Sequence, residues 1–202
     1  PPPSPILSYT NLDIEDEEKV EEVVEGADIV VNCAAVARVS EAKGCEGVNI
    51  PSVLILAVKK QPRCILVHFS TDLVYRGGEE GGGEGDGEGG VVLEPITAYG
   101  VQKAKADALI HTNLGSRGRV LRCSNIIGPP APFTSAPKFL DWVKQNAERK
   151  VDDAEKRATV WSDEKRCFVH VEDVVEGVLR IVDDDECCLV DAIGPELLSR
   201  AE

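Results

Sequence analysis

The sequence predicts an α/β fold with a doubly wound parallel sheet. Three continuous apolar runs of strand length are separated by segments in which apolar residues recur at helical spacing. An alternation of strands and helices is typical of β–α–β units, in which the crossover helix makes the two strands parallel. With 202 residues, the chain has room for one medium α/β domain, or for one domain plus a small lobe.

The predicted strands are apolar runs that end in small or polar residues, as expected for strands covered on both faces. They are "ADIVVNCAA" at 27–35, "CILVHFST" at 64–71 and "RVLRCSNIIG" at 119–128. Helices are predicted around and between these strands, at 16–25, within 40–60 and at 98–114. Each strand is therefore linked to the next by a helical crossover.

The last third of the chain predicts a smaller lobe packed against the sheet. After a loop at 128–137, a helix is predicted at 138–150, an extended segment at 157–171 and a helix at 172–182, capped near Glu172–Asp173. We place the boundary so that the sheet domain covers 1–127 and the lobe covers 128–202.

An unusual insert interrupts the sheet domain at 77–90. It contains only glycine and acidic residues, with the sequence "GGEEGGGEGDGEGG". This composition predicts a flexible, solvated loop.

The composition of the chain limits its possible binding partners and its cellular location. A net charge of −14 disfavours nucleic acid and anionic membranes as partners, and no apolar run has the length of a membrane span. The seven cysteines form no CxxC pair, which predicts a reducing, cytoplasmic location and no structural zinc. The three histidines lack metal-ligand spacing, so no metal site is expected, and His68 and His170 are interpreted as core or surface residues.

Two segments carry groups suited to proton transfer. Tyr99 and Lys103 are four residues apart on a predicted helix, so their side chains share one face. A neighbouring ammonium stabilises a phenolate and lowers its pKa, which would allow the pair to exchange a proton with an alcohol or a developing alkoxide. Ser70 or Thr71 offers a second hydroxyl at the end of a strand, where parallel sheets bind ligands. The Tyr–Lys spacing alone is common on helix surfaces.

The ordered set "NCAA", "STDLVYRG", "AYGVQKAKAD" and "VLRCSNIIGP" resembles the extended short-chain dehydrogenase/reductase superfamily. Within it, the chain is most similar to the dTDP-4-dehydrorhamnose reductase (RmlD-like) group, which includes the regulatory beta subunit of methionine adenosyltransferase. The resemblance runs from about Leu12 to Ser199. It implies a Rossmann-like NAD(P)-binding domain at 1–127 and a partial substrate-binding lobe at 128–202.

The resemblance also implies roles for individual residues. Thr71 matches the catalytic hydroxyl, Tyr99 the general acid, and Lys103 the partner of Tyr99 that also holds the nicotinamide ribose. Tyr99 and Lys103 are thus cofactor contacts as well as catalytic residues. The remaining implied cofactor contacts follow the strands: Asp13 near the adenine, Asn32, Ala34 and Ala35 along the cofactor, and Ser124 and Asn125 near the nicotinamide and substrate.

One family element has no counterpart in this sequence. The family begins with a strand and a GxxGxxG turn that holds the dinucleotide pyrophosphate at a helix N-terminus, and nothing upstream of Asp13 matches it. The run at 77–90 does not replace it, because its acidic residues would repel phosphate. We therefore expect an N-terminally truncated sheet, in agreement with the lack of any methionine.

The resemblance implies an NAD(P)-dependent reductase of a nucleotide-linked 4-keto-sugar, with NADP or NAD as the cofactor. Two alternatives stay open at this point. The chain could be a non-catalytic regulatory subunit that binds a partner enzyme, or an inactive truncated fragment. Fold-level similarity does not separate these functions.

Overall fold

The computed structural model describes residues 8, 10–38, 41–75, 93–129 and 165–199. The glycine-rich insert at 77–90, most of the predicted loop at 128–137 and the predicted helix at 138–150 lie outside the described residues.

The main sheet is parallel and has four strands in the order β1-β2-β3-β6. Its strands are β1 (Ile29–Asn32), β2 (Ile65–Thr71), β3 (Gly118–Cys123) and β6 (Leu189–Ala192). The predicted parallel α/β sheet is confirmed. Because the strands are parallel, their carboxyl ends lie at one edge, where Thr71 is in register with Cys123 and Cys123 with Ala192.

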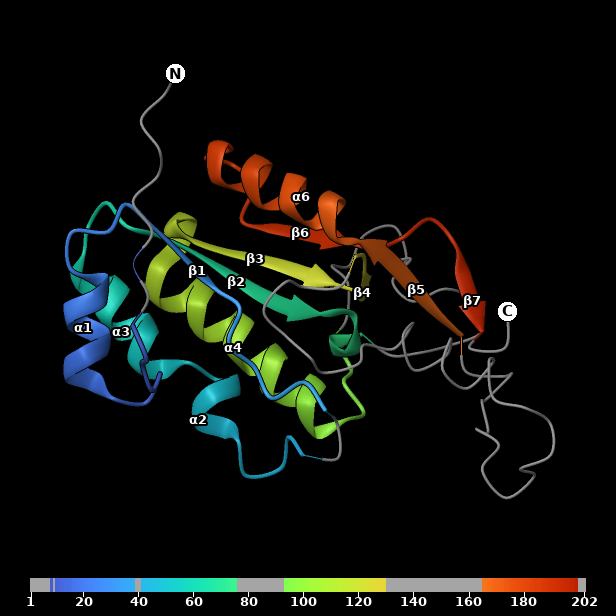
Figure 1. Ribbon diagram of the computed structural model, residues 1–202, viewed down its shortest axis with the longest axis horizontal. Helices are drawn as coiled ribbons and strands as arrows, with labels where there is room; N and C mark the ends of the chain where they lie inside the picture. Colours follow the sequence, from blue (N-terminus) through green and yellow to red (C-terminus); the bar gives the residue numbers. More distant parts are fainter. Residues whose placement is uncertain (1–7, 9, 39–40, 76–92, 130–164, 200–202) are drawn as a thin grey trace.

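Helices cover both faces of this sheet (Figure 1). On one face lie α1 (Glu17–Val24), α2 (Glu46–Asn49), α3 (Ser52–Lys60) and α4 (Ala98–Leu114), and on the other lies α6 (Val171–Asp183). The larger core cluster joins α1, α3 and α4 to the sheet through residues such as Val20, Ile55, Leu66 and Ile110. A smaller cluster under α6 includes Leu121 and Val174.

The helix ends follow local sequence signals. Asp16 caps α1 by accepting a hydrogen bond from the Lys19 amide, and Thr97 caps α4 by accepting one from the Gly100 amide. The α4 helix ends at Leu114 and is capped by Gly115, whose φ of 56° favours glycine. The helical stretch expected within 40–60 divides into α2 and α3, and Pro51, which has no amide hydrogen, stands directly before α3.

Two details of the sequence prediction are wrong. The single strand expected at 119–128 is two strands, because β3 ends at Cys123 and β4 (Asn125–Ile127) turns away into a second sheet. The Ser124 amide between them still donates to Ala192 of the main sheet. The cap expected near Glu172–Asp173 is His170, since α6 begins at Val171 and the acidic residues occupy its first turn.

The second sheet has three strands in the order β4-β5-β7, formed by Asn125–Ile127, Lys165–His170 and Leu197–Ser199. β4 and β5 are parallel, whereas β7 is antiparallel to β5. Residues beyond 128 contribute strands to both sheets, because β6 belongs to the main sheet, whereas β5 and β7 belong to the second one. Within the described residues, no helix is long and apolar enough to span a membrane.

Candidate functional site

The candidate site lies where the strands of the main sheet end beside α4. Thr71 ends β2, Cys123 ends β3, and Asn32 ends β1 one position before Cys33. The 3₁₀-helix η1 (Asp72–Val74) follows β2 directly and contacts α4. Polar side chains from distant parts of the sequence are therefore gathered at the edge where open parallel sheets bind ligands.

The α4 helix supplies one face of this site. Tyr99, Lys103 and Asp107 follow one another at intervals of four residues, and all three are buried. The adjacent Gly100 permits close packing, because a Cβ atom there would lie 2.3 Å from the Leu73 carbonyl oxygen of η1. This contact holds the start of α4 against the segment that follows Thr71.

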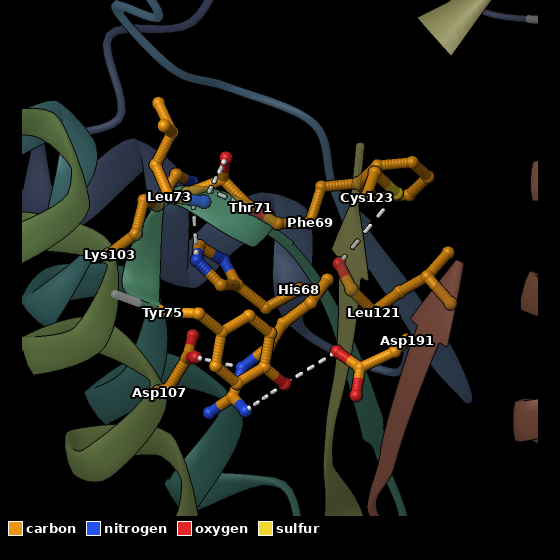
Figure 2. A network of polar contacts seen from close by, with 11 residues as sticks. His68, Phe69, Thr71, Leu73, Tyr75, Lys103, Asp107, Leu121, Cys123 and Asp191 are labelled. Atoms are coloured by element: carbon orange, nitrogen blue, oxygen red, sulfur yellow. Dashed lines mark hydrogen bonds and ion pairs between the residues drawn. The ribbon is translucent and has the colours of Figure 1, made fainter. Parts of the chain in front are cut away.

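Lys103 is anchored to β2 rather than directed to solvent. Its side chain is only 1% exposed, and its Nζ atom donates a hydrogen bond to the Phe69 carbonyl at 2.7 Å. Nζ also lies 3.3 Å from Nε2 of His68 (Figure 2). Burial lowers the pKa of Lys103 from 10.5 to about 8, partly opposed by the Asp107 carboxylate. The amine is thus available in both protonation states near neutral pH.

Tyr99 lies beside this amine but does not have a lowered pKa. The Lys103 Nζ atom is 5.9 Å from the centre of the Tyr99 ring. Burial, with smaller contributions from Cys123 and Asp72, raises the pKa of Tyr99 to about 12. The lowered pKa expected from the sequence is therefore wrong for this structure, because desolvation outweighs the nearby cation. At neutral pH the phenol holds its proton and can only donate it.

Thr71 occupies the turn from β2 into η1. Its Oγ1 atom accepts a hydrogen bond from the Leu73 amide at 3.3 Å and is 3.2 Å from Oδ1 of Asp72, to which it donates. Burial raises the pKa of Asp72. The hydroxyl is thereby held at the strand end, close to a carboxyl group that shifts toward its neutral form.

A second network of hydrogen bonds connects Asp107 of α4 to the neighbouring strands β3 and β6. Arg122 on β3 donates from Nε to Asp107 at 3.0 Å and from Nη1 to the Tyr75 hydroxyl at 2.7 Å. The Tyr75 hydroxyl in turn donates to Asp191 at 2.7 Å (Figure 2). These hydrogen bonds connect Arg122 on β3, Tyr75 directly after η1 and Asp191 on β6. Sequence reasoning missed Tyr75, Arg122 and Asp191. The four-residue spacing after Lys103 is a signal that does point to Asp107.

The predicted cofactor contacts divide into exposed and buried residues. Ala34 and Ala35 are accessible just after β1, and Asn125 is exposed on β4. Asn32 and Ser124 are buried. The Asn32 side chain is turned inward, where its Oδ1 accepts from the Ala34 amide and its Nδ2 lies 3.0 Å from Nδ1 of His68. Asp13 is exposed and forms a turn before α1, with Oδ1 accepting from the Glu15 amide.

His68 is the main site residue whose role the sequence pattern does not reveal. Its place in an apolar run favours a packing role, yet the side chain is fully buried between Asn32 and Lys103 and contacts both. Its alignment with Asn32 across the β1–β2 register brings these two side chains together.

The described residues fit the nicotinamide end of a dinucleotide better than its pyrophosphate. The buried Ser124 hydroxyl has no hydrogen-bond partner in this part of the chain, and the alanines after β1 leave the strand end open. The Ser124 hydroxyl and the remaining N–H of protonated Lys103 are the groups that would bind a nicotinamide ribose. Among the described residues, no helix begins with a glycine-rich turn suited to a pyrophosphate, and no cluster of metal-ligating side chains occurs there.

Comparison with known families identifies this architecture. The model of the NAD dependent epimerase/dehydratase family matches residues 4–187. The chain belongs to this family. The match confirms the extended short-chain dehydrogenase/reductase resemblance at the level of the epimerase/dehydratase family.

One curated relative and two solved structures show what this chain is similar to. A dTDP-glucose 4,6-dehydratase from Streptomyces antibioticus is 32% identical over 137 residues, covering 63% of this chain and 40% of the relative. A solved dTDP-glucose 4,6-dehydratase from Streptomyces venezuelae, with NAD bound, has a TM-score of 0.75 at 22% identity and matches 94% of this chain and 59% of its own. A dTDP-4-dehydrorhamnose reductase from Clostridium acetobutylicum has a TM-score of 0.73 at 18% identity, with 93% and 64% covered.

The two solved structures share their fold with this chain. The chain spans less than two thirds of the length of each of these relatives.

Proposed function

We propose that the protein containing this chain is an NAD(P)-dependent enzyme of nucleotide-sugar metabolism, and that it reduces a nucleotide-linked 4-keto-sugar. The observation that supports this proposal is the buried Tyr99–Lys103 pair on α4, packed through Gly100 against the segment that follows Thr71. Relatives in the same family act on dTDP-sugars according to their names, and one is solved with NAD bound.

The protein groups would act as a proton-donating set. A bound nicotinamide would supply the hydride to the keto carbon. Tyr99 holds its proton at neutral pH, because burial raises its pKa to about 12, and it would donate that proton to the resulting alkoxide, which is a stronger base than a phenolate. The Thr71 hydroxyl would turn its O–H from Asp72 to donate to the same oxygen. Lys103 would bind the nicotinamide ribose and replace the proton lost by Tyr99.

A dehydratase is the second candidate, and one specific observation favours it. Dehydration of a hexose adds a proton abstraction and a proton donation to the hydride transfer, so it needs a further acid–base group. Asp72 is half-buried next to Thr71, and burial raises its pKa above the usual value. The relative from Streptomyces antibioticus is named as a dehydratase.

The first experiment is a fluorescence titration of the 202-residue chain with NADPH and with NADH. Saturable binding supports a surviving cofactor pocket. A chain that is folded by circular dichroism but binds neither dinucleotide contradicts the proposal for this chain.

Two activity assays then separate the candidates. Oxidation of NADPH or NADH by a dTDP-linked 4-keto-6-deoxy-sugar supports the reductase. Formation of a 4-keto product from dTDP-glucose with NAD supports the dehydratase. Dinucleotide binding without either reaction favours the regulatory-subunit alternative, which copurification with a partner enzyme would then test.

A further inference from the structure

His68 occupies a position in which its two ring nitrogens face different partners. Nδ1 lies 3.0 Å from Nδ2 of Asn32, and Nε2 lies 3.3 Å from Nζ of Lys103. The ring is fully buried in the middle of β2, so no solvent is at hand to complete its hydrogen bonds. Rotating the ring by half a turn would replace both nitrogens by carbons and lose both contacts.

The orientation of Asn32 is fixed independently of His68. Its Oδ1 accepts a hydrogen bond from the Ala34 amide at 3.0 Å, and an exchanged side-chain amide would place two donors against each other. Nδ2 therefore faces His68 as a donor. This arrangement requires Nδ1 of His68 to be an acceptor, so the ring proton sits on Nε2.

A proton on Nε2 is compatible with only one form of Lys103. The Nε2–H group must donate to Lys103, whose nitrogen accepts only when the amine is neutral. In that state Nζ still donates to the Phe69 carbonyl at 2.7 Å, and each contact in this chain pairs one donor with one acceptor. When Lys103 is protonated, Nε2 must accept instead, the ring proton moves to Nδ1, and Nδ1–H meets the amide donor of Asn32.

We propose that His68 is a positioning residue of the candidate site, which changes between its two neutral tautomers as Lys103 gains or loses a proton. In the protonated state, Asn32 must turn its amide and release the Ala34 amide. The charge of Lys103 is thereby linked to the turn at Asn32–Ala34, which carries predicted cofactor contacts. The catalytic importance of this link rests on the proposed function, whereas the link itself does not.

The neighbouring ionisable groups agree with this assignment. Burial, and then the nearby Lys103, lower the pKa of His68 well below its usual value, so the ring stays neutral while its tautomer changes. Lys103 itself is faced by Asp107 and Tyr99 from α4, by Cys33 after β1 and by Cys123 at the end of β3. Because burial raises the pKa values of both cysteines, neither thiol is expected to titrate together with Lys103.

The test is a pH series of long-range ¹H–¹⁵N spectra on the full 202-residue chain labelled with ¹⁵N-histidine. Protonated and unprotonated ring nitrogens have well-separated ¹⁵N shifts, so each spectrum reports the tautomer directly. We expect His68 to carry its proton on Nδ1 at low pH and on Nε2 at high pH, with a midpoint near the Lys103 pKa of about 8. In a uniformly ¹⁵N-labelled sample, the Ala34 amide signal should move with the same midpoint. His111 and His170 serve as internal controls.

Two variants shift the tautomer in opposite directions. Lys103→Met removes the amine at similar length, so Asn32 alone should hold the Nε2–H tautomer at every pH. Asn32→Asp replaces the donor by an acceptor while its other oxygen can still receive the Ala34 amide, so it should hold the proton on Nδ1 at every pH. Amide spectra establish that each variant is folded, and each variant tests the proposal without the other.

Several results would overturn the proposal. A wild-type tautomer that does not change across the pH series would exclude the coupling. A change that persists in Lys103→Met would assign it to another titrating group, and an Asn32→Asp variant that keeps the wild-type switch would remove Asn32 from the chain of contacts. Because no readout depends on dinucleotide or substrate, failure of the proposed function leaves this test unaffected.

Discussion

Arg122 on β3 donates its Nε–H to the carboxylate of Asp107 on α4 across 3.0 Å, and the two side chains are only 8% and 6% exposed. A buried ion pair of this kind is costly to break, because removal of one partner leaves an uncompensated charge. The ion pair connects α4, which carries Tyr99 and Lys103, to β3, which ends at Cys123.

Arg122→Met should therefore lower the free energy of unfolding by about 3–5 kcal/mol. The matched control is Arg180→Met, which breaks an exposed pair with Glu176 on α6 and should cost less than ~0.5 kcal/mol. Urea denaturation measures both. Equal losses in the two variants would show that the buried pair adds no more than the surface pair.

Gly100→Ala should disturb the site by steric overlap. The added Cβ would lie 2.3 Å from the Leu73 carbonyl oxygen, so α4 and η1 must move apart, at a cost of about 1–3 kcal/mol. Gly177→Ala on α6 is the control, since its Cβ would make an ordinary 3.4 Å contact with Leu121 and should gain up to about 1 kcal/mol from helix propensity. Thermal unfolding compares the two, and a neutral Gly100→Ala would contradict the close packing.

Lys103 should give the protein a specific dependence of stability on pH. Its pKa falls from 10.5 to about 8 on folding, so between these values the unfolded chain binds more protons than the native one. The Lys103 contribution to stability therefore increases as pH rises through this window and is lost as pH falls toward its lower end. The expected gain between about pH 8 and about pH 10 is roughly 2 kcal/mol.

The difference between wild type and Lys103→Met isolates this contribution, because the cysteines and Tyr99 titrate in both proteins. Urea denaturation at several pH values measures it. A difference that stays constant with pH would mean that Lys103 titrates normally in the folded protein.

Tyr99→Phe should separate binding from proton transfer. If the proposed reductase is correct, loss of the phenol proton lowers kcat by about 10²–10⁴-fold, while NADPH affinity changes little. Stopped-flow or steady-state NADPH oxidation gives kcat, and the fluorescence titration gives the affinity. Turnover that survives the substitution would remove Tyr99 from the proton-transfer step.

Local sequence signals were sufficient to specify the class of fold and most of its elements. Apolar runs such as Ile65–Thr71 and the helical pattern of Ala98–Leu114 predict strands and helices close to those observed. The passage of the chain at Ser124 from β3 in the main sheet to β4 in the second sheet is not predictable in this way, because it depends on pairing partners that are distant in sequence. The ordered motifs also point to Thr71, Tyr99 and Lys103 as candidate site residues.

Tertiary packing determined how those residues behave. Desolvation is a property of the packed interior, so the raised pKa of Tyr99 and the lowered pKa of Lys103 do not follow from their spacing. The contacts of His68 with Asn32 and Lys103 arise from strand register and from the packing of α4 on β2. Local pattern pointed to Thr71, Tyr99 and Lys103 as candidates. Long-range packing placed His68 beside Lys103 and shifted the pKa values of Tyr99 and Lys103, because burial changes the solvation on which ionisation depends.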